Sequence, residues 1–159
     1  MNLTKEEALA DLNECNRAFY LEHKMQDLQP MFFLFRSSET IPVLCPFDDD
    51  RSKDLAISVL RRKVRELGDV YMYAFISEGW ALRLPPGSDP SKSVRPSKSD
   101  QRIELVTTMV VHRDGTRLSD MHELIRDWKT GHVIELKALD RTDQMETRFE
   151  LFPTQEKED

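Results

Sequence analysis

The hydrophobic run at residues 69–84 constrains the fold of this chain more than any other segment. Apolar side chains occupy both alternating positions of the run, with Ala74 and Ile76 on one side and Tyr73 and Phe75 on the other. A strand that faces water on one side alternates apolar and polar residues, whereas a strand covered on both faces is apolar throughout. The run therefore predicts the central strand of a sheet.

An acidic residue interrupts this run. The same alternation places Glu78 on the face that carries Ile76 and Trp80, next to Gly79. A carboxylate inside an apolar strand must be paired, hydrated, protonated or released by a β-bulge. Glu78 is accordingly the first candidate for a functional position.

The flanking sequence predicts two helices and several further strands. Apolar residues recur at helical intervals over about residues 5–26 and 52–67, and the first of these segments begins with the capping-box spacing of Thr4 and Glu7. Gly68 is placed to end the second helix, which we expect to cross over and enter the central strand parallel to a strand of the preceding hairpin. Short apolar or alternating runs predict strands at 31–36, 41–47, 103–111, 132–139 and 145–151. Residues 116–126 fit either a strand or a short helix, and the hairpin signal Asp114-Gly115 favours the strand.

These elements predict one α+β domain over residues 1–152, followed by a charged tail at 153–159. Its sheet is expected to be mixed but mainly antiparallel, with about six or seven strands and two helices packed on one face. Residues 85–100 interrupt the pattern because they are rich in proline and serine and lack periodicity. This long loop is locally basic over 83–102, so it is either a linker or a contact surface for an acidic partner or phosphate.

Composition limits the classes of function. The formal net charge of −6 argues against a protein whose whole surface binds nucleic acid, which leaves only the basic 83–102 loop for such a contact. The polar N-terminal segment and the lack of a long apolar run predict a soluble, cytoplasmic protein without membrane contact. Cys15 and Cys45 lie in apolar patterns and are expected to be free buried thiols.

Metal and cofactor motifs are incomplete. His122 and Glu123 begin the zinc-protease pattern H-E-x-x-H, but Arg126 stands where the second histidine belongs. His112 and His132 would complete a looser metal cluster only in a register that the spacing does not require. None of the five glycines forms a phosphate-binding loop, so we expect no metal and no cofactor.

The remaining polar candidate is a constellation of Glu78 with Arg102 and Asp100. If the strands on either side of the long loop pair with each other, a guanidinium comes within reach of the carboxylate. Such a half-buried pair is usually architectural, whereas a carboxylate without compensation would mark a site.

A sequence pattern in the middle third of the chain resembles a family of small uncharacterised proteins of bacteria and phages. In that family an apolar strand ending in S-E-A-W precedes a loop with P-S-x-D-P-x-R-x-E; here Gly79 replaces the alanine and Gln101 the second proline. The resemblance implies no activity, because none is established for such proteins. It implies positions of interest at Glu78, Trp80, Pro96, Ser97, Asp100, Arg102 and Glu104.

Two hypotheses follow for function. The first is an accessory protein without catalysis that contacts a protein partner or a second copy of itself, with binding residues Trp80, Arg95, Ser97, Asp100, Arg102 and Glu104. The second is a small hydrolase-like or anion-binding enzyme, in which Glu78 acts as acid or base and Arg102 or His112 holds the anion.

Overall fold

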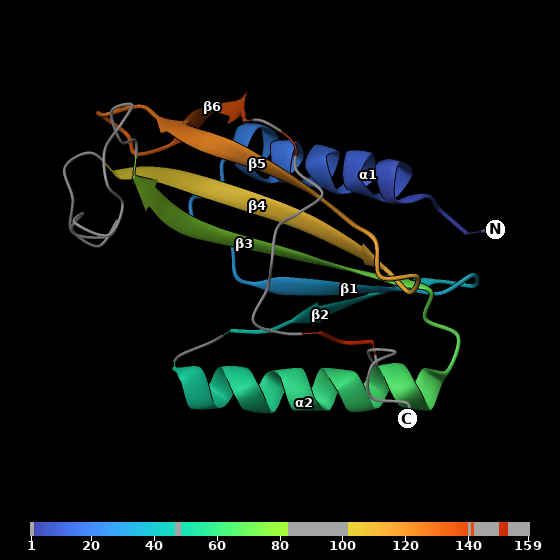
Figure 1. The fold of residues 1–159 in the computed structure, drawn as a ribbon. Coiled ribbons are helices and arrows are strands. Elements are labelled where there is room, and N and C mark those ends of the chain that lie inside the picture. Colours follow the sequence, from blue (N-terminus) through green and yellow to red (C-terminus); the bar gives the residue numbers. More distant parts are fainter. Residues whose placement is uncertain (1, 47–48, 83–101, 140, 142–149, 153–159) are drawn as a thin grey trace, which may run out of the picture.

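A computed structural model describes residues 2–46, 49–82, 102–139, 141 and 150–152 (Figure 1). The chain begins with helix α1 (Lys5–Arg17), which continues as the π-helical turn η1 (Ala18–Glu22). A hairpin of β1 (Met31–Phe35) and β2 (Thr40–Leu44) precedes helix α2 (Asp50–Leu67). Four further strands follow: β3 (Met72–Leu82), β4 (Arg102–His112), β5 (Arg117–Arg126) and β6 (Val133–Ala138).

The strands form one six-stranded sheet in the order β2-β1-β3-β4-β5-β6. Every neighbouring pair is antiparallel, so the α+β class is confirmed but the sheet is not mixed. The crossover through α2 explains the difference. It returns β3 in the same direction as β2, as expected, but β1 lies between them and pairs antiparallel with both.

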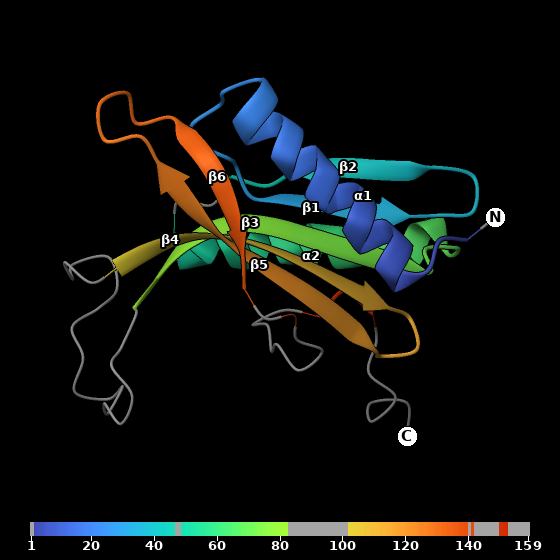
Figure 2. The same cartoon turned by 90° about the horizontal axis from the view of Figure 1, so that it is seen from above.

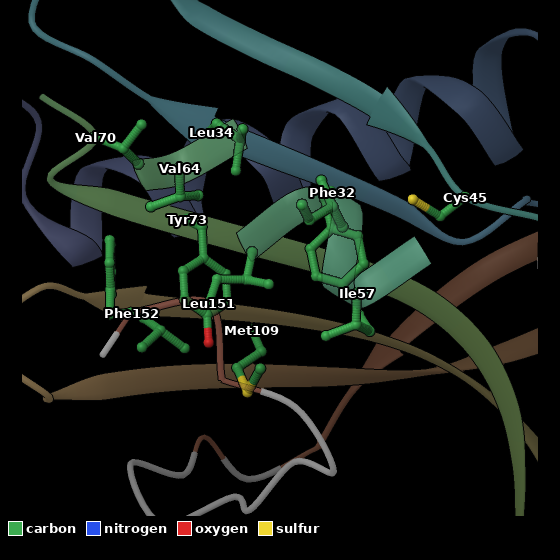
Figure 3. Close-up of a cluster of buried hydrophobic side chains, with 12 residues drawn as sticks. Phe32, Leu34, Cys45, Ile57, Val64, Val70, Tyr73, Met109, Leu151 and Phe152 are labelled. Carbon is green, nitrogen blue, oxygen red and sulfur yellow. The ribbon is translucent and has the colours of Figure 1, made fainter. Parts of the chain in front are cut away.

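The two helices cover opposite faces of the sheet, which corrects the expectation that both pack on one face (Figures 1 and 2). On one side α2 packs Ile57, Leu60 and Val64 against a cluster that includes Phe32 and Tyr73 (Figure 3). On the other side α1 and η1 pack against the following residues: Met72, Ala74, Ile76, Val106 and Val110. We call these sides the α2 face and the α1 face. The alternation in β3 thus supplies a core to each helix.

Local signals set the helix ends. Thr4 and Glu7 form the predicted capping box at the start of α1, and Asp49 and Ser52 form another at the start of α2. Gly68 ends α2 with a φ of 74°, a left-handed conformation that glycine adopts without strain. The first helix ends at Glu22, earlier than predicted.

The cysteine predictions are half correct. Both thiols are free, but only Cys45 is buried, whereas Cys15 is exposed on α1. Cys15 lies outside the buried stripe of the first helix, which includes Leu9, Asn16 and Tyr20.

The second half is the expected meander. Asp114-Gly115 lies in the turn between β4 and β5, and residues 117–126 are a strand as favoured. Of the predicted strand at 145–151, residues 145–149 lie outside the described residues; Leu151 and Phe152 are buried on the α2 face beside Tyr73. The long 85–100 loop and the tail at 153–159 also lie outside the described part.

Candidate functional site

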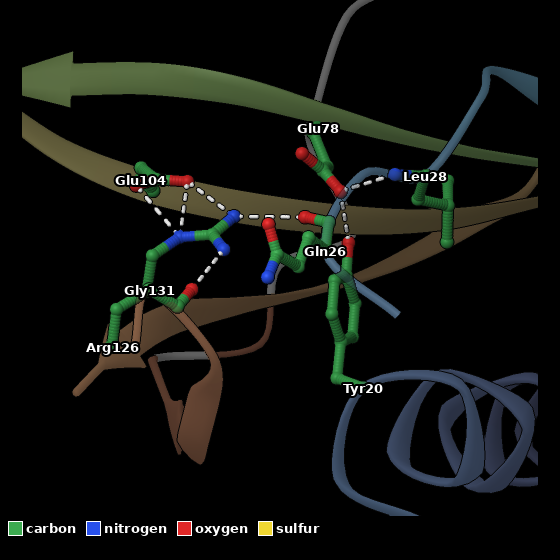
Figure 4. Close-up of polar contacts among 7 residues, drawn as sticks. All are labelled: Tyr20, Gln26, Leu28, Glu78, Glu104, Arg126 and Gly131. Atoms are coloured by element: carbon green, nitrogen blue, oxygen red, sulfur yellow. Dashed lines mark hydrogen bonds and ion pairs between the residues drawn. The ribbon is translucent and has the colours of Figure 1, made fainter. Parts of the chain in front are cut away.

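Glu78 lies on the α1 face of β3, near the end of the strand, where it is half-buried. Its Oε1 atom accepts two hydrogen bonds, at 2.5 Å from the hydroxyl of Tyr20 and at 2.6 Å from the backbone N–H of Leu28 (Figure 4). Both donors belong to the segment that leads from α1 to β1. The carboxylate in the apolar strand is therefore compensated by pairing, which is one of the outcomes that the sequence allowed.

Tyr20 is the main partner of this carboxylate. Its side chain is completely buried, and it belongs to the π-helical turn η1. Burial, and then the hydrogen bond to Glu78, raise the pKa of its hydroxyl far above the ordinary tyrosine range. Tyr20 consequently remains a protonated donor, which suits an anchor and not a general base.

Arg126, at the end of β5, forms a second anchor beside the first (Figure 4). Its guanidinium donates to both carboxylate oxygens of Glu104 at 3.0–3.1 Å. It also donates to the carbonyl of Gly131 at 2.8 Å and to that of Gln26 at 2.9 Å. The hydrogen bond to Glu104, opposed by partial burial, raises the pKa of Arg126. One side chain therefore joins β4, the β5–β6 turn and the segment before β1.

Arg102 occupies a different place from the one that the sequence predicted. Its guanidinium lies over the ring of Trp80, 4.4 Å from the centroid, and Arg126 is the arginine of the polar network beside Glu78. Both Arg102 and Trp80 remain exposed to solvent. The predicted binding residue Glu104 is held by Arg126, while Arg95, Ser97 and Asp100 lie outside the described residues.

His112 does not meet Glu78. Glu78 pairs with Val106 on β4, and His112 lies at the far end of that strand, so a strand rise of about 3.4 Å per residue separates the two by roughly 20 Å. There the Nδ1 atom of His112 accepts from the backbone N–H of Asp114 at 3.1 Å. A hollow of about 340 Å³ also lies at this far end, between the start of α1 and the β4–β5 turn. The geometry gives no acid–base pair of Glu78 and His112.

A second polar cluster lies between α1 and the sheet. The alternation patterns of the strands did not predict it. Asp120 on β5 receives two hydrogen bonds from Arg141, at 2.7 and 2.8 Å, and one from Asn13 at 2.7 Å. Burial alone would raise the pKa of Asp120, but these hydrogen bonds outweigh it and hold the pKa below its usual range. The amide of Asn16 donates to Thr108 at 2.8 Å in the buried interface. The asparagines on the apolar stripe of α1 were the available signal for this cluster.

Two exposed tryptophans lie at the same end of the sheet, where β3 ends, β4 begins and β5 turns into β6 (Figure 1). The side chain of Trp80 is 44% exposed and that of Trp128 is 88% exposed. Each lies beside a cation, since the Nζ atom of Lys129 is 5.3 Å from the ring of Trp128, and Arg102 covers Trp80. We call Trp80, Arg102, Trp128 and Lys129 the tryptophan end.

Within the described parts of the chain, no group of three or more histidine, cysteine, aspartate or glutamate side chains could hold a metal ion. His122 and Glu123 belong to strand β5, so they lack the helical spacing that the zinc-protease pattern requires. Burial lowers the pKa of His122, against an opposing effect of Asp120. No described helix is long and apolar enough to cross a membrane.

Comparison with known proteins identifies no relative: the chain matches no family model, no curated protein and no solved structure.

Proposed function

We propose that this protein is a non-catalytic interaction module that binds a protein partner through the tryptophan end. One observation carries the proposal: both tryptophans of the chain are exposed, at one end of one sheet. Tryptophan is among the residues most enriched at the energetic centres of protein interfaces, and large exposed apolar side chains mark such surfaces. We place this role in the cytosol, since two free thiols fit a reducing compartment.

The turn that carries Trp128 supports this assignment because it is held by hydrogen bonds along its length. Asp127 donates its backbone N–H to the carbonyl of His132 at 2.8 Å, and Gly131 donates to the carbonyl of Asp127 at 2.8 Å. The carboxylate of Asp127 also accepts from the backbone N–H of Lys129 at 2.8 Å. A side chain displayed on a fixed turn loses less conformational entropy on binding than one on a flexible loop.

The polar groups at this end also favour binding over catalysis. Oε1 of Glu78 accepts from two donors of the chain itself, and the candidate partner His112 lies at the other end of the strand. A catalytic carboxylate has to exchange a proton with substrate. Glu78 is better suited to holding the segment between α1 and β1 against the sheet.

A photo-crosslinking amino acid placed at position 128 tests the proposal in cells that naturally produce the protein. We expect one discrete adduct with a second protein. The matched control carries the crosslinker at position 55, because Leu55 is 66% exposed on α2, the helix that covers the face of the sheet opposite to α1. The proposal fails if positions 80 and 128 both give no discrete adduct, or give the same products as position 55.

Affinity for the crosslinked partner provides the second measurement. Trp128→Ala should weaken binding by about thirtyfold, the effect of losing an interface contact of about 2 kcal/mol. Its melting temperature should match that of the native protein, because the side chain packs little against its own fold. Leu55→Ala should bind normally.

A further inference from the structure

The two edge strands of the sheet, β2 and β6, differ in their backbone groups. In an antiparallel pair, residues alternately direct their N–H and C=O groups toward the partner strand and away from it. In the turn between β1 and β2 the backbone N–H of Arg36 donates to the carbonyl of Glu39, and the register then directs the N–H and C=O groups of Ile41 and Val43 on β2 toward β1. Pro42 therefore faces outward. Because proline has no N–H, its position blocks the addition of another strand at this edge.

The β6 edge lacks such a block. The backbone N–H of Leu139 donates to the carbonyl of Met121 at 2.9 Å. The register therefore directs Glu135 and Lys137 toward β5, and it directs the N–H and C=O groups of Leu136 and Ala138 outward. Within the described residues, no strand pairs with this outer side of β6.

We propose that the β6 edge pairs antiparallel with the β6 edge of a second copy of this chain, centred on Leu136. Outward groups must face outward groups, so Leu136 lies opposite Leu136 of the second copy, or the strands slip by two residues. In the centred register Glu135 lies opposite Lys137 of the second copy, and Lys137 lies opposite its Glu135. A slip of two residues in either direction places Glu135 opposite Glu135 or Lys137 opposite Lys137. The charges therefore select the centred register.

The face of β6 that carries Leu136 supports the same pairing. Ile134 is 61% exposed, although the residue before it, Val133, is buried on the α1 face. Ile134 lies at the register shift of β6, where it has no partner residue on β5. In the centred register this exposed residue lies next to the C-terminal end of β6 of the second copy. Pairing thus brings the two Leu136 side chains together on one face and forms two ion pairs on the other. The backbone groups of the two Leu136 residues form hydrogen bonds between the strands. The two sheets become one continuous sheet.

This inference does not rest on the proposed function, because it uses the β6 edge and leaves the tryptophan end free. Sedimentation velocity or light scattering over a range of protein concentrations tests it directly. We expect a monomer–dimer equilibrium. Glu135→Lys and Lys137→Glu, each alone, oppose like charges at both central pairs and should weaken the dimer by about tenfold or more at low salt.

The double variant Glu135→Lys/Lys137→Glu provides the decisive rescue, because the exchanged charges again oppose each other in the centred register. It should dimerise like the native chain, whereas Glu66→Lys on α2 serves as a charge-reversal control without effect. Ala138→Pro should give a folded monomer, because it copies at an outward position of β6 the block that Pro42 forms on β2. The inference is overturned if the native chain is monomeric at about 0.1 mM. It is also overturned if single and double reversals behave alike.

Discussion

The hydrogen bond from Tyr20 to Glu78 should contribute measurably to stability, and a double-mutant cycle isolates its contribution. Tyr20→Phe keeps the buried ring and removes only the hydroxyl that donates to the carboxylate at 2.5 Å. A hydrogen bond to a charged group contributes about 1.5–3 kcal/mol, so Tyr20→Phe should lower the free energy of unfolding by that amount. For a chain of this size, this corresponds to a decrease of roughly 3–12 °C in melting temperature.

The charge of Glu78 determines most of this effect. In a Glu78→Gln background the acceptor is a neutral amide, and a neutral hydrogen bond contributes only about 0.5–1.5 kcal/mol. Urea unfolding of the native chain, both single variants and the double variant should therefore give a coupling free energy of about 1 kcal/mol. Tyr71→Phe is the matched control, because the hydroxyl of Tyr71 accepts from the backbone N–H of Leu3 and not from Glu78. Its effect on the free energy of unfolding should therefore be additive with that of Glu78→Gln. Equal costs of Tyr20→Phe in both backgrounds would refute the anchoring role of this pair.

Three further variants test other parts of the fold by urea unfolding. Arg126→Ala should lower the free energy of unfolding by about 2–3 kcal/mol, because it leaves the half-buried Glu104 and two carbonyl groups without their donor. Arg126→Lys should recover only part of this loss. Full recovery would contradict the role of the forked guanidinium contact. Asp120→Asn should flatten the decrease in stability below about pH 4. Burial alone would raise the pKa of Asp120, but the hydrogen bonds from Arg141 and Asn13 hold this pKa low, so the contribution of Asp120 to stability is present above about pH 4 and is lost as the pH falls. An unchanged pH profile would exclude this linkage. Gly68→Ala should lower the free energy of unfolding by about 1 kcal/mol, because Gly68 has a φ of 74° that alanine adopts only with strain. An unchanged free energy of unfolding would contradict the left-handed conformation at this helix end.

The sequence predicted the elements of this fold better than their arrangement. Short-range patterns were sufficient for the capping box at Thr4, the helix end at Gly68 and the turn at Asp114-Gly115, because each depends on residues a few positions apart. The predicted placement of both helices on one face was wrong, although the sequence contained the observation that argues for opposite faces. A central strand that is apolar at both Ala74 and Tyr73 requires a cover on each face, and two helices on one face would leave the other exposed.

The candidate site shows the same limit. The alternation in the central strand correctly marked Glu78 as a carboxylate that needs compensation. Its partner Tyr20 is 58 positions away in sequence, so no local period could identify it. Asn16 and Tyr20 follow Leu9 and Leu12 on the buried stripe of the helix, and two polar groups on such a stripe were the only signal that the facing strand supplies polar partners.

The polar contacts of the α1 face connect the stability of the fold to the proposed binding surface. Arg126 holds the carbonyl groups of Gln26 and Gly131, and Gly131 belongs to the turn that displays Trp128. The arginine therefore fixes the position of an exposed side chain that it does not cover. If the tryptophan end binds a partner, Arg126→Ala should weaken that binding even under conditions where the variant is fully folded, because the turn would lose its preorganisation.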